Sequence, residues 1–138
     1  YDTPLYHRNI NPDAFYIFDI RGKYKPLLAK FDCTKDSADA SFTVFQNVEK
    51  KVHNQNTNQF FAPEVLKANM GIGVDWEKAD IYSLAKMILF ILTGRIIEDT
   101  DCIDEINGLD DELKLVFMEM LDDEPQNRPE ISNLLNSL

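Results

Sequence analysis

The sequence predicts a mostly α-helical protein with one small β-hairpin, α+β overall, folded as a single domain over residues 1–138. Three observations predict this class. First, an aromatic and β-branched run at 15–18 is followed by a glycine-containing turn and a second strand-like run. Second, residues 76–93 are apolar on nearly every face of a helix. Third, residues 113–121 carry apolar side chains at helical spacing. The apolar fraction of 44% is typical of a chain that forms one hydrophobic core.

The first third of the chain is predicted to contain the hairpin, over residues 15–29. Residues 15–18 read Phe-Tyr-Ile-Phe, residues 19–23 contain Gly22 and form a turn candidate, and residues 24–29 return as a strand. Pro26 lacks a backbone N–H, so it fits only an edge strand or a strand end. Residues 32–59 are polar without sustained periodicity, and we expect them to form a long loop whose part from 33 to 58 is the least ordered of the domain.

Three helices are predicted after residue 65. Asp75 is a candidate N-cap for a helix over 76–93, and Gly94 is a plausible stop. Because this helix is apolar nearly all round, we expect it to be central and buried. Two further apolar stripes predict amphipathic helices. The first contains Leu113, Val116, Phe117, Met120 and Leu121, and the second, after Pro129, contains Ile131, Leu134, Leu135 and Leu138.

Charge and composition limit the class of partner and the location. The net charge is −10, and residues 71–138 carry 5 Lys or Arg against 16 Asp or Glu. Such a surface repels phosphate groups, so we expect neither nucleic acid nor an anionic membrane as a partner. Two explanations of the acidic charge are left: it attracts a basic protein partner, or, more simply, it maintains solubility. The apolar stretch 81–92 is too short to span a bilayer and is interrupted by Ser83 and Lys86. Without a signal peptide or a disulfide framework, we expect an intracellular, cytoplasmic protein.

Four short motifs occur in a characteristic order. Residues 7–14 read His-Arg-Asn-Ile-Asn-Pro-Asp-Ala, residues 62–64 read Ala-Pro-Glu, residues 80–84 read Asp-Ile-Tyr-Ser-Leu, and residues 127–129 read Asn-Arg-Pro. Each motif alone is weak, but together they resemble the C-terminal lobe of eukaryotic protein kinases. The resemblance covers almost the whole chain and implies a catalytic-loop-like segment at 5–14, the hairpin at 15–29, an activation-segment-like region at 30–64 and a helical region at 65–138. It also implies that the N-lobe is absent from this chain.

The residues that would perform phosphoryl transfer differ from the family pattern. That reaction needs a positioned carboxylate, metal ligands and cations on the phosphates. The resemblance aligns Asn9 with the catalytic Asp, Asn11 with the catalytic-loop Lys and Ala14 with the Asn that holds a second Mg²⁺. Asn9 is neutral and cannot serve as a base, and Ala14 has no ligand atom. With Phe31 in the Phe position of the Asp-Phe-Gly motif, Lys30 replaces the metal-binding Asp. Asp32, two positions further on, is a weak substitute for that metal ligand.

The residues that support the family's scaffold are retained. The resemblance implies an ion pair between Glu64 and Arg128, hydrogen bonds from the loop backbone to Asp80, and a stack of His7 on Phe31, whose side chain should point into the core. Arg8 could bind a phosphorylated residue of the long loop or pair with a nearby carboxylate or carbonyl. The candidates for that loop site are Ser41, Thr43 and Thr57, with Lys50, Lys51 and His53 adding positive charge.

We therefore interpret the sequence as a pseudokinase-like interaction or regulatory module without cofactor. A protein partner or an N-lobe is expected to cover its upper face. The alternative is a divergent serine/threonine protein kinase that uses ATP and Mg²⁺, with its N-lobe encoded outside this segment.

Overall fold

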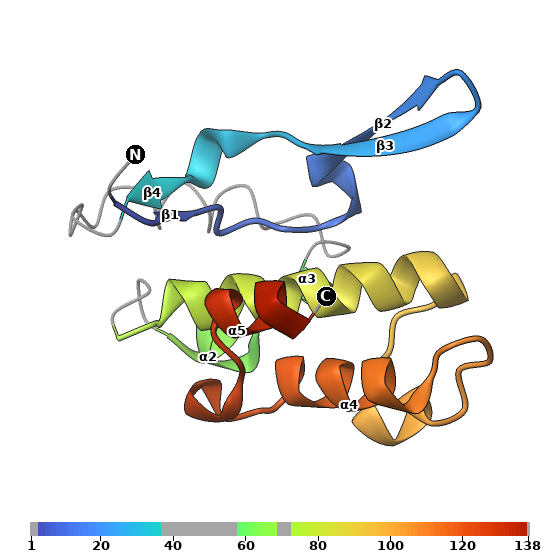
Figure 1. Ribbon diagram of the computed structural model, residues 1–138. Helices are drawn as coiled ribbons and strands as arrows, with labels where there is room; N and C mark the ends of the chain where they lie inside the picture. Colours follow the sequence, from blue (N-terminus) through green and yellow to red (C-terminus); the bar gives the residue numbers. More distant parts are fainter. Residues whose placement is uncertain (1–2, 37–57, 69–72, 138) are drawn as a thin grey trace.

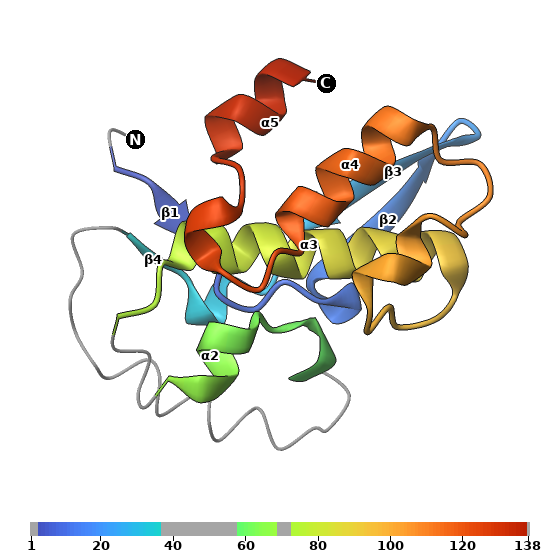
Figure 2. The same cartoon turned by 90° about the horizontal axis from the view of Figure 1, so that it is seen from below.

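A computed structural model describes residues 3–36, 58–68 and 73–137, and these form two layers (Figure 1). The strands lie in one layer, and the helices lie in the other. Helix α3 (Trp76–Thr93) runs between the strand layer and helix α4 (Asp111–Met120) in this view, and the view from below shows α4 alongside α3 (Figure 2). The short helices α2 (Pro63–Lys67) and α5 (Ile131–Ser137) lie beside α3. The expected hairpin and all three expected helices are present.

The hairpin consists of β2 (Phe15–Ile20) and β3 (Lys23–Leu28), which pair antiparallel. Its turn uses two residues with positive φ, Arg21 at 55° and Gly22 at 77°, and the Asp19 carboxylate accepts a hydrogen bond from the Gly22 N–H at 2.8 Å. Pro26 lies opposite Ile17. The proline is tolerated because both strands of a two-stranded sheet are edge strands.

A second antiparallel pair was not expected from the sequence. Strand β1 (Leu5–Tyr6) pairs with β4 (Lys35–Asp36), so that the two ends of the described range 3–36 lie side by side. Each strand has two residues, which is too short to show an alternating pattern in sequence. Five 3₁₀ turns complete the described elements: Pro12–Ala14, Phe31–Cys33, Asn58–Phe60, Thr100–Ile103 and Pro125–Asn127.

Helix α3 has the bounds that its capping residues predict. The Asp75 carboxylate accepts from the Lys78 N–H at 3.2 Å, and Gly94 ends the helix at φ 70° while its N–H donates to the Phe90 carbonyl at 2.8 Å. The expectation that the whole helix is buried is wrong at its last turn. Ile91 and Leu92, close to the end of the helix, are 63% and 54% exposed.

Helices α4 and α5 differ in how much of their expected apolar stripe is buried. At α4, Phe117, Met120 and Leu121 are buried and Leu113 and Val116 are half-buried, as expected. Helix α4 begins after Asp110, whose carboxylate accepts from the Leu113 N–H at 2.8 Å. Among the described side chains of α5, Leu134 is buried, whereas Ile131 and Leu135 are 45% and 68% exposed, so this part of the expected stripe is not a buried face. Leu138, the last residue of that stripe, lies outside the described residues. The helix has only seven residues and meets the core with one turn.

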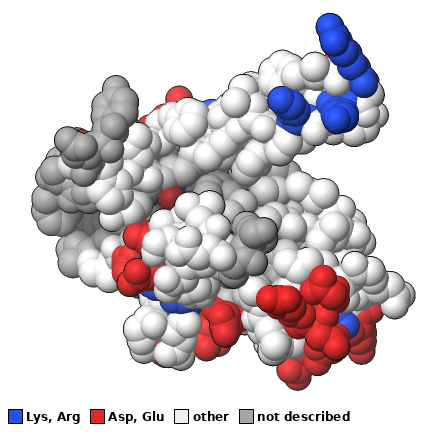
Figure 3. All heavy atoms as spheres, viewed as in Figure 1, with Lys and Arg blue, Asp and Glu red and all other residues white. Residues whose placement is uncertain are grey.

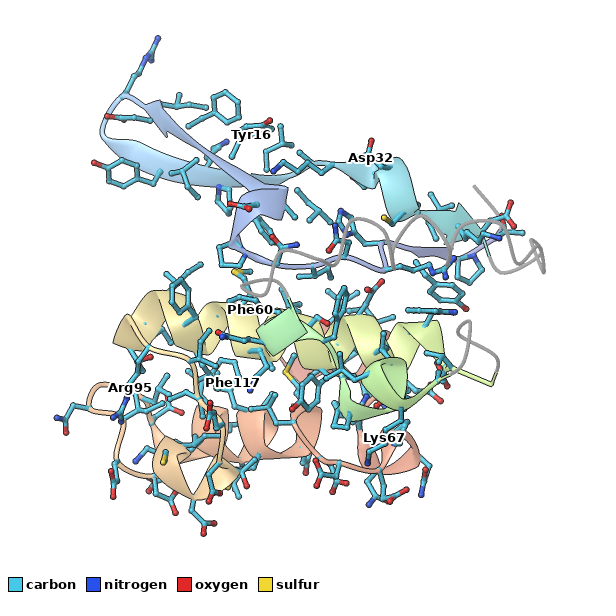
Figure 4. The ribbon with its side chains drawn as sticks, turned by 180° about the vertical axis from the view of Figure 1, so that it is seen from behind. Tyr16, Asp32, Phe60, Lys67, Arg95 and Phe117 are labelled. Carbon is cyan, nitrogen blue, oxygen red and sulfur yellow. The ribbon has the colours of Figure 1, made fainter. Side chains whose placement is uncertain are left out.

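Two apolar clusters form the core. The larger lies where α3 meets α4, with Phe117 between the two helices, and the smaller joins α2 to the start of α3 (Figure 4). The larger cluster consists of Ile81, Ala85, Leu89, Ile97, Ile103, Ile106, Phe117, Met120, Leu121 and Leu134. The smaller cluster consists of Cys33, Phe61, Ala62, Val65 and Ala79. Both cysteines are free thiols, and no helix within the described ranges is both long and apolar enough to cross a bilayer.

Candidate functional site

The loop of residues 5–14 is anchored to helix α3 by Asp80. One carboxylate oxygen of Asp80 accepts from the His7 N–H at 2.6 Å, and the other accepts from the Arg8 N–H at 2.8 Å. Burial raises the pKa of Asp80 to about 6, although the two backbone N–H donors and the nearby positive charges oppose this. One side chain from the second turn of α3 therefore fixes the conformation of a loop more than 70 positions earlier.

His7 connects this loop to the end of the hairpin. Its Nε2 donates to the Ala29 carbonyl at 2.8 Å, because a carbonyl oxygen can only accept. The His7 ring also contacts Phe31 edge-on, with centroids 5.2 Å apart and an interplanar angle of 66°. The expectation that Phe31 points into the core is wrong, since this side chain is 56% exposed. Phe31 lies in the strand layer, where the contact with His7 leaves more than half of its side chain exposed.

Arg8 is buried and lies against an aromatic ring. Its backbone is left-handed, with φ 65°, and its guanidinium carbon is 4.0 Å from the centroid of the Trp76 ring. This cation–π contact joins the loop to the first residue of α3. Sequence reasoning assigned Trp76 to the helix start but missed this contact. The candidate phosphorylation sites Ser41, Thr43 and Thr57 and the basic residues Lys50, Lys51 and His53 lie outside the described residues, as does most of the segment 33–58.

The polar side chains of the loop hydrogen-bond to one another. The Asn11 amide donates to the Asn9 side-chain oxygen and to the Asn9 carbonyl, both at 3.0 Å, and the Asn11 side-chain oxygen accepts from the Asp13 N–H at 2.9 Å. Asn11 thus caps the 3₁₀ turn Pro12–Ala14. Ala14 is fully buried, and its N–H and carbonyl bond to Asn11 and Ala29. These three positions carry two amides and a methyl group, and no carboxylate.

Lys30 and Asp32 lie at the end of the hairpin. Lys30 has a left-handed backbone, with φ 59°, and precedes the 3₁₀ turn Phe31–Cys33. Both side chains are exposed, and Asp32 lies on the strand layer, on the side away from the helices (Figure 4). Across the described ranges, no group of three or more His, Cys, Asp or Glu side chains is arranged to hold a metal ion. Asp32 is therefore not part of such a group within the part of the chain that the structure describes.

Glu64 and Arg128 connect α2 to the segment before α5. Arg128 Nη1 and Nη2 donate to the two Glu64 carboxylate oxygens at 2.6 and 2.8 Å. The Arg128 side chain is fully buried, and its remaining donors reach the Lys78 carbonyl at 3.0 Å and the Asp122 carbonyl at 2.8 Å. The guanidinium also lies 4.8 Å from the Tyr82 ring centroid. This pair therefore joins four segments of the chain through one side chain.

A cavity of about 320 Å³ lies beside the loop, at the end of α3. Asn11, Pro12 and Asp13 form one side of it, and Phe60 and Phe90 form the other, with their rings edge-on at 5.7 Å. Phe60 is buried and Phe90 is half-buried. The cavity could accept an apolar side chain next to the amides of the loop. Among its lining residues, the exposed Asp13 is the one side chain that could act as a base on a bound hydroxyl group.

Comparison with solved structures identifies the architecture. A structure of the Rad53 kinase domain with SCD2 superposes with a TM-score of 0.60 at 18% identity and covers 96% of this chain and 48% of that chain. The same domain in complex with AMPPNP gives a TM-score of 0.58 at 17% identity, over 96% of this chain and 49% of that chain. The apo form of PpkA-294 gives 0.61 at 17% identity, over 95% and 45%. The fold is that of a protein kinase C-lobe.

Among curated proteins, the chain is similar to one of Acanthamoeba polyphaga mimivirus that is named "Putative serine/threonine-protein kinase". The two are 29% identical over 152 residues, which is 100% of this chain and 50% of the relative. No family model matches the sequence. This C-lobe therefore spans about half the length of the proteins that it matches. The kinase-like fold predicted from the motifs is confirmed, whereas the roles of individual residues rest on the geometry described above.

Proposed function

We propose that this chain is a kinase-fold regulatory domain that binds protein and does not transfer phosphate. The observation that carries the proposal is the loop of residues 5–14, whose backbone is anchored while its reactive groups are missing. Asp80 holds the backbone at His7 and Arg8, yet Asn9 lies where a base would be needed and its amide oxygen accepts from Asn11. An amide cannot remove the proton of an attacking hydroxyl group.

The metal positions support the same proposal. Mg²⁺ needs oxygen ligands, and a carboxylate is the usual protein donor. The side chains at the corresponding positions are Lys30, which is cationic, and Ala14, which is fully buried and apolar. Asp32 is exposed at the end of the hairpin, two positions after Lys30. The positive charge of the Lys30 ammonium disfavours the binding of Mg²⁺ there. We therefore expect no cofactor.

The strand layer supports a role in protein binding. Six large apolar side chains of the hairpin are about half exposed or more: Tyr16, Ile17, Phe18, Ile20, Tyr24 and Leu27. Side chains alternate along a strand and paired residues share a face, so Tyr16, Phe18, Ile20 and Leu27 lie on one face of the hairpin. Exposed apolar surface of this kind is typical of an interface. We propose that an N-lobe or a partner protein covers this upper face.

The alternative is a divergent serine/threonine kinase that uses ATP and Mg²⁺. The similarity to a protein named as such a kinase favours it. The two functions make opposite predictions for the intact protein incubated with radiolabelled ATP, Mg²⁺ and a mixed serine/threonine peptide library. We expect no transfer above a no-enzyme control and no thermal shift on adding ATP with or without Mg²⁺. Transfer that disappears in the Asn9→Ala or Asp32→Asn variant would establish the kinase alternative.

A further inference from the structure

The negative charge of the chain is concentrated in one short segment. Residues 94–124 contain 12 Asp or Glu and 2 Lys or Arg, which is a net charge of −10. The other 107 residues contain 12 of each sign, so this segment accounts for the whole net charge. Figure 3 shows the acidic side chains gathered on the side of the molecule opposite the hairpin, over helix α4 and the segment before it. A solubilising charge would not need to be confined to one face.

A cavity of about 650 Å³ opens on this acidic face. Helix α3 contributes Tyr82 and Lys86 to it, and Met118 and Leu121 add apolar surface from α4 and its end. Four carboxylates also line it: Glu98, Asp99, Asp122 and Asp123. The volume is within the range of a site for a peptide side chain and the backbone beside it.

Two of the four carboxylates are engaged in local turns. Asp99 accepts from the Asp101 N–H at 3.0 Å, and Asp122 accepts from the Glu124 N–H at 2.8 Å. Glu98 and Asp123 are exposed, and neither carboxylate forms a hydrogen bond with another described residue. These two carboxylates are therefore available to a cation that enters the cavity.

Lys86 is an unusual residue for the middle of a core helix. It is 7% exposed, its amine donates to the Ile97 carbonyl, and it lies 5.9 Å from the Tyr82 ring centroid. Burial lowers the pKa of Lys86, with Glu98 opposing the effect. Within the described ranges, no carboxylate forms an ion pair with this ammonium. A buried ammonium carries three donors, so one carbonyl leaves it short of acceptors.

We propose that this cavity is a docking site for a basic peptide segment of a partner protein. An arginine or lysine side chain of the peptide lies between Glu98 and Asp123, and a backbone carbonyl next to it accepts a hydrogen bond from Lys86. The inference deepens the proposed binding function by naming a partner chemistry and a surface, and it does not require the hairpin face.

The two kinds of group in the cavity favour a peptide over a simple cation. A metal ion or polyamine would use the carboxylates but would offer no acceptor to the Lys86 ammonium, and a simple anion would be repelled by the four carboxylates. A basic peptide presents a cation and a neutral carbonyl a few ångströms apart. It therefore satisfies both groups, and the surrounding negative field attracts it to the site.

The test is a fluorescence-anisotropy titration of the intact protein, without nucleotide, with a labelled peptide of alternating glycine and arginine. A peptide of the same length with glutamine for arginine is the control ligand. We expect saturable binding of the arginine peptide alone. Glu98→Gln and Asp123→Asn should each weaken it about two- to fivefold, as expected for the loss of one exposed ion pair. Both residues are on the surface, so the variants should fold like the parent.

Asp111→Asn is the matched control variant. It removes one charge from the same acidic segment, but Asp111 is fully exposed on α4 and does not line the cavity. We expect its affinity to equal that of the parent within error. Lys86→Met, which preserves the length of the side chain, should weaken binding if its melting temperature shows that it is folded.

The proposal is overturned if the arginine peptide does not bind, or if Asp111→Asn weakens binding as much as the two cavity variants. The first result excludes the site, and the second shows a diffuse attraction to the acidic face. Neither result bears on phosphoryl transfer, which the radiolabel assay measures separately. A failure of the docking site is thus distinguishable from a failure of the proposed function.

Discussion

Arg128 is joined to Glu64 by two parallel hydrogen bonds, with Nη1–Oε1 at 2.6 Å and Nη2–Oε2 at 2.8 Å, although the residues are 64 positions apart. The guanidinium is fully buried, whereas the Glu64 side chain is 18% exposed. The guanidinium also donates to the backbone carbonyls of Lys78, Asp122 and Asp123. Removing the arginine therefore leaves a mostly buried carboxylate without its charged partner and takes one hydrogen bond from each of these carbonyls.

We predict that Arg128→Ala lowers the free energy of unfolding by about 3–5 kcal/mol, the usual effect of breaking one side of a buried ion pair. Urea denaturation, followed through the fluorescence of the single tryptophan, measures it. Arg95→Ala is the matched control, because Arg95 is exposed and its side chain points away from the core (Figure 4). A loss below about 1 kcal/mol for Arg128→Ala would show that the pair does not join these segments energetically.

The Arg8–Trp76 contact predicts an energetic coupling between the loop and helix α3. The guanidinium lies 4.0 Å from the ring centroid, and Arg8 is buried. In a double-mutant cycle of Arg8→Met and Trp76→Leu, we expect a coupling of about 0.5–2 kcal/mol, the range for a partly desolvated cation–π contact. The measurement is urea denaturation followed by circular dichroism, since one variant lacks the tryptophan. Additive effects of the two substitutions would mean that the contact is only steric.

Much of the fold could be predicted from the sequence because local chemistry sets it. Asp75 and Gly94 mark the ends of α3, and Asp110 marks the start of α4, since capping needs only the residues at the helix end. The β1–β4 pair and the exposure of Leu135 could not be predicted, because they depend on contacts between segments far apart in sequence.

In the candidate site, too, some contacts could be predicted from the sequence and others could not. The motifs predicted that Asp80 meets the loop and that Glu64 meets Arg128, and both contacts are present. The sequence did not predict that Trp76 covers Arg8 or that Lys86 lies in a cavity. Lys86 was visible only as an interruption of the apolar run in 81–92, and a single charged residue in such a run does not indicate what surrounds it.

The raised pKa of Asp80 predicts how stability depends on pH. A folded-state pKa of about 6, above the ordinary value near 4, means that the folded protein binds this proton more tightly than the unfolded chain does. The contribution is therefore fully present below about pH 4 and is lost as the pH rises through about 6. The difference between 3.8 and about 6 corresponds to about 3 kcal/mol as an upper value.

We propose to measure this dependence by urea denaturation of the parent and of Asp80→Asn between pH 4 and pH 8. The asparagine variant does not titrate, so the parent should lose stability relative to it across this range. The variant also loses one backbone hydrogen bond, which shifts its stability equally at every pH. A difference between the two proteins that stays constant with pH would show that Asp80 is ionised throughout.

The exposed apolar surface of the hairpin predicts self-association of this chain on its own. Ile17, Phe18 and Leu27 are 60%, 49% and 53% exposed. Covering an apolar side chain of this size contributes roughly 1.5–3 kcal/mol, against a total stability of about 5–15 kcal/mol for a small domain. A groove of about 310 Å³, lined by Leu5, Ile10, Ile81, Leu84 and Ile131 among others, offers a second apolar surface along α3. The net charge of −10 opposes association but does not cover these side chains.

Sedimentation velocity over a concentration series tests this prediction. We expect the parent chain to form dimers or larger species as the concentration rises. The triple variant Ile17→Thr, Phe18→Thr, Leu27→Thr should remain monomeric, because threonine keeps the strand propensity of the hairpin and reduces its exposed apolar surface. Leu135→Thr is the control, since Leu135 is 68% exposed on α5, away from the hairpin, and should associate like the parent. The prediction is wrong if the parent is a monomer at every concentration reached. It is also wrong if Leu135→Thr prevents association as well as the triple variant does, because the hairpin is then not the surface through which the chain associates.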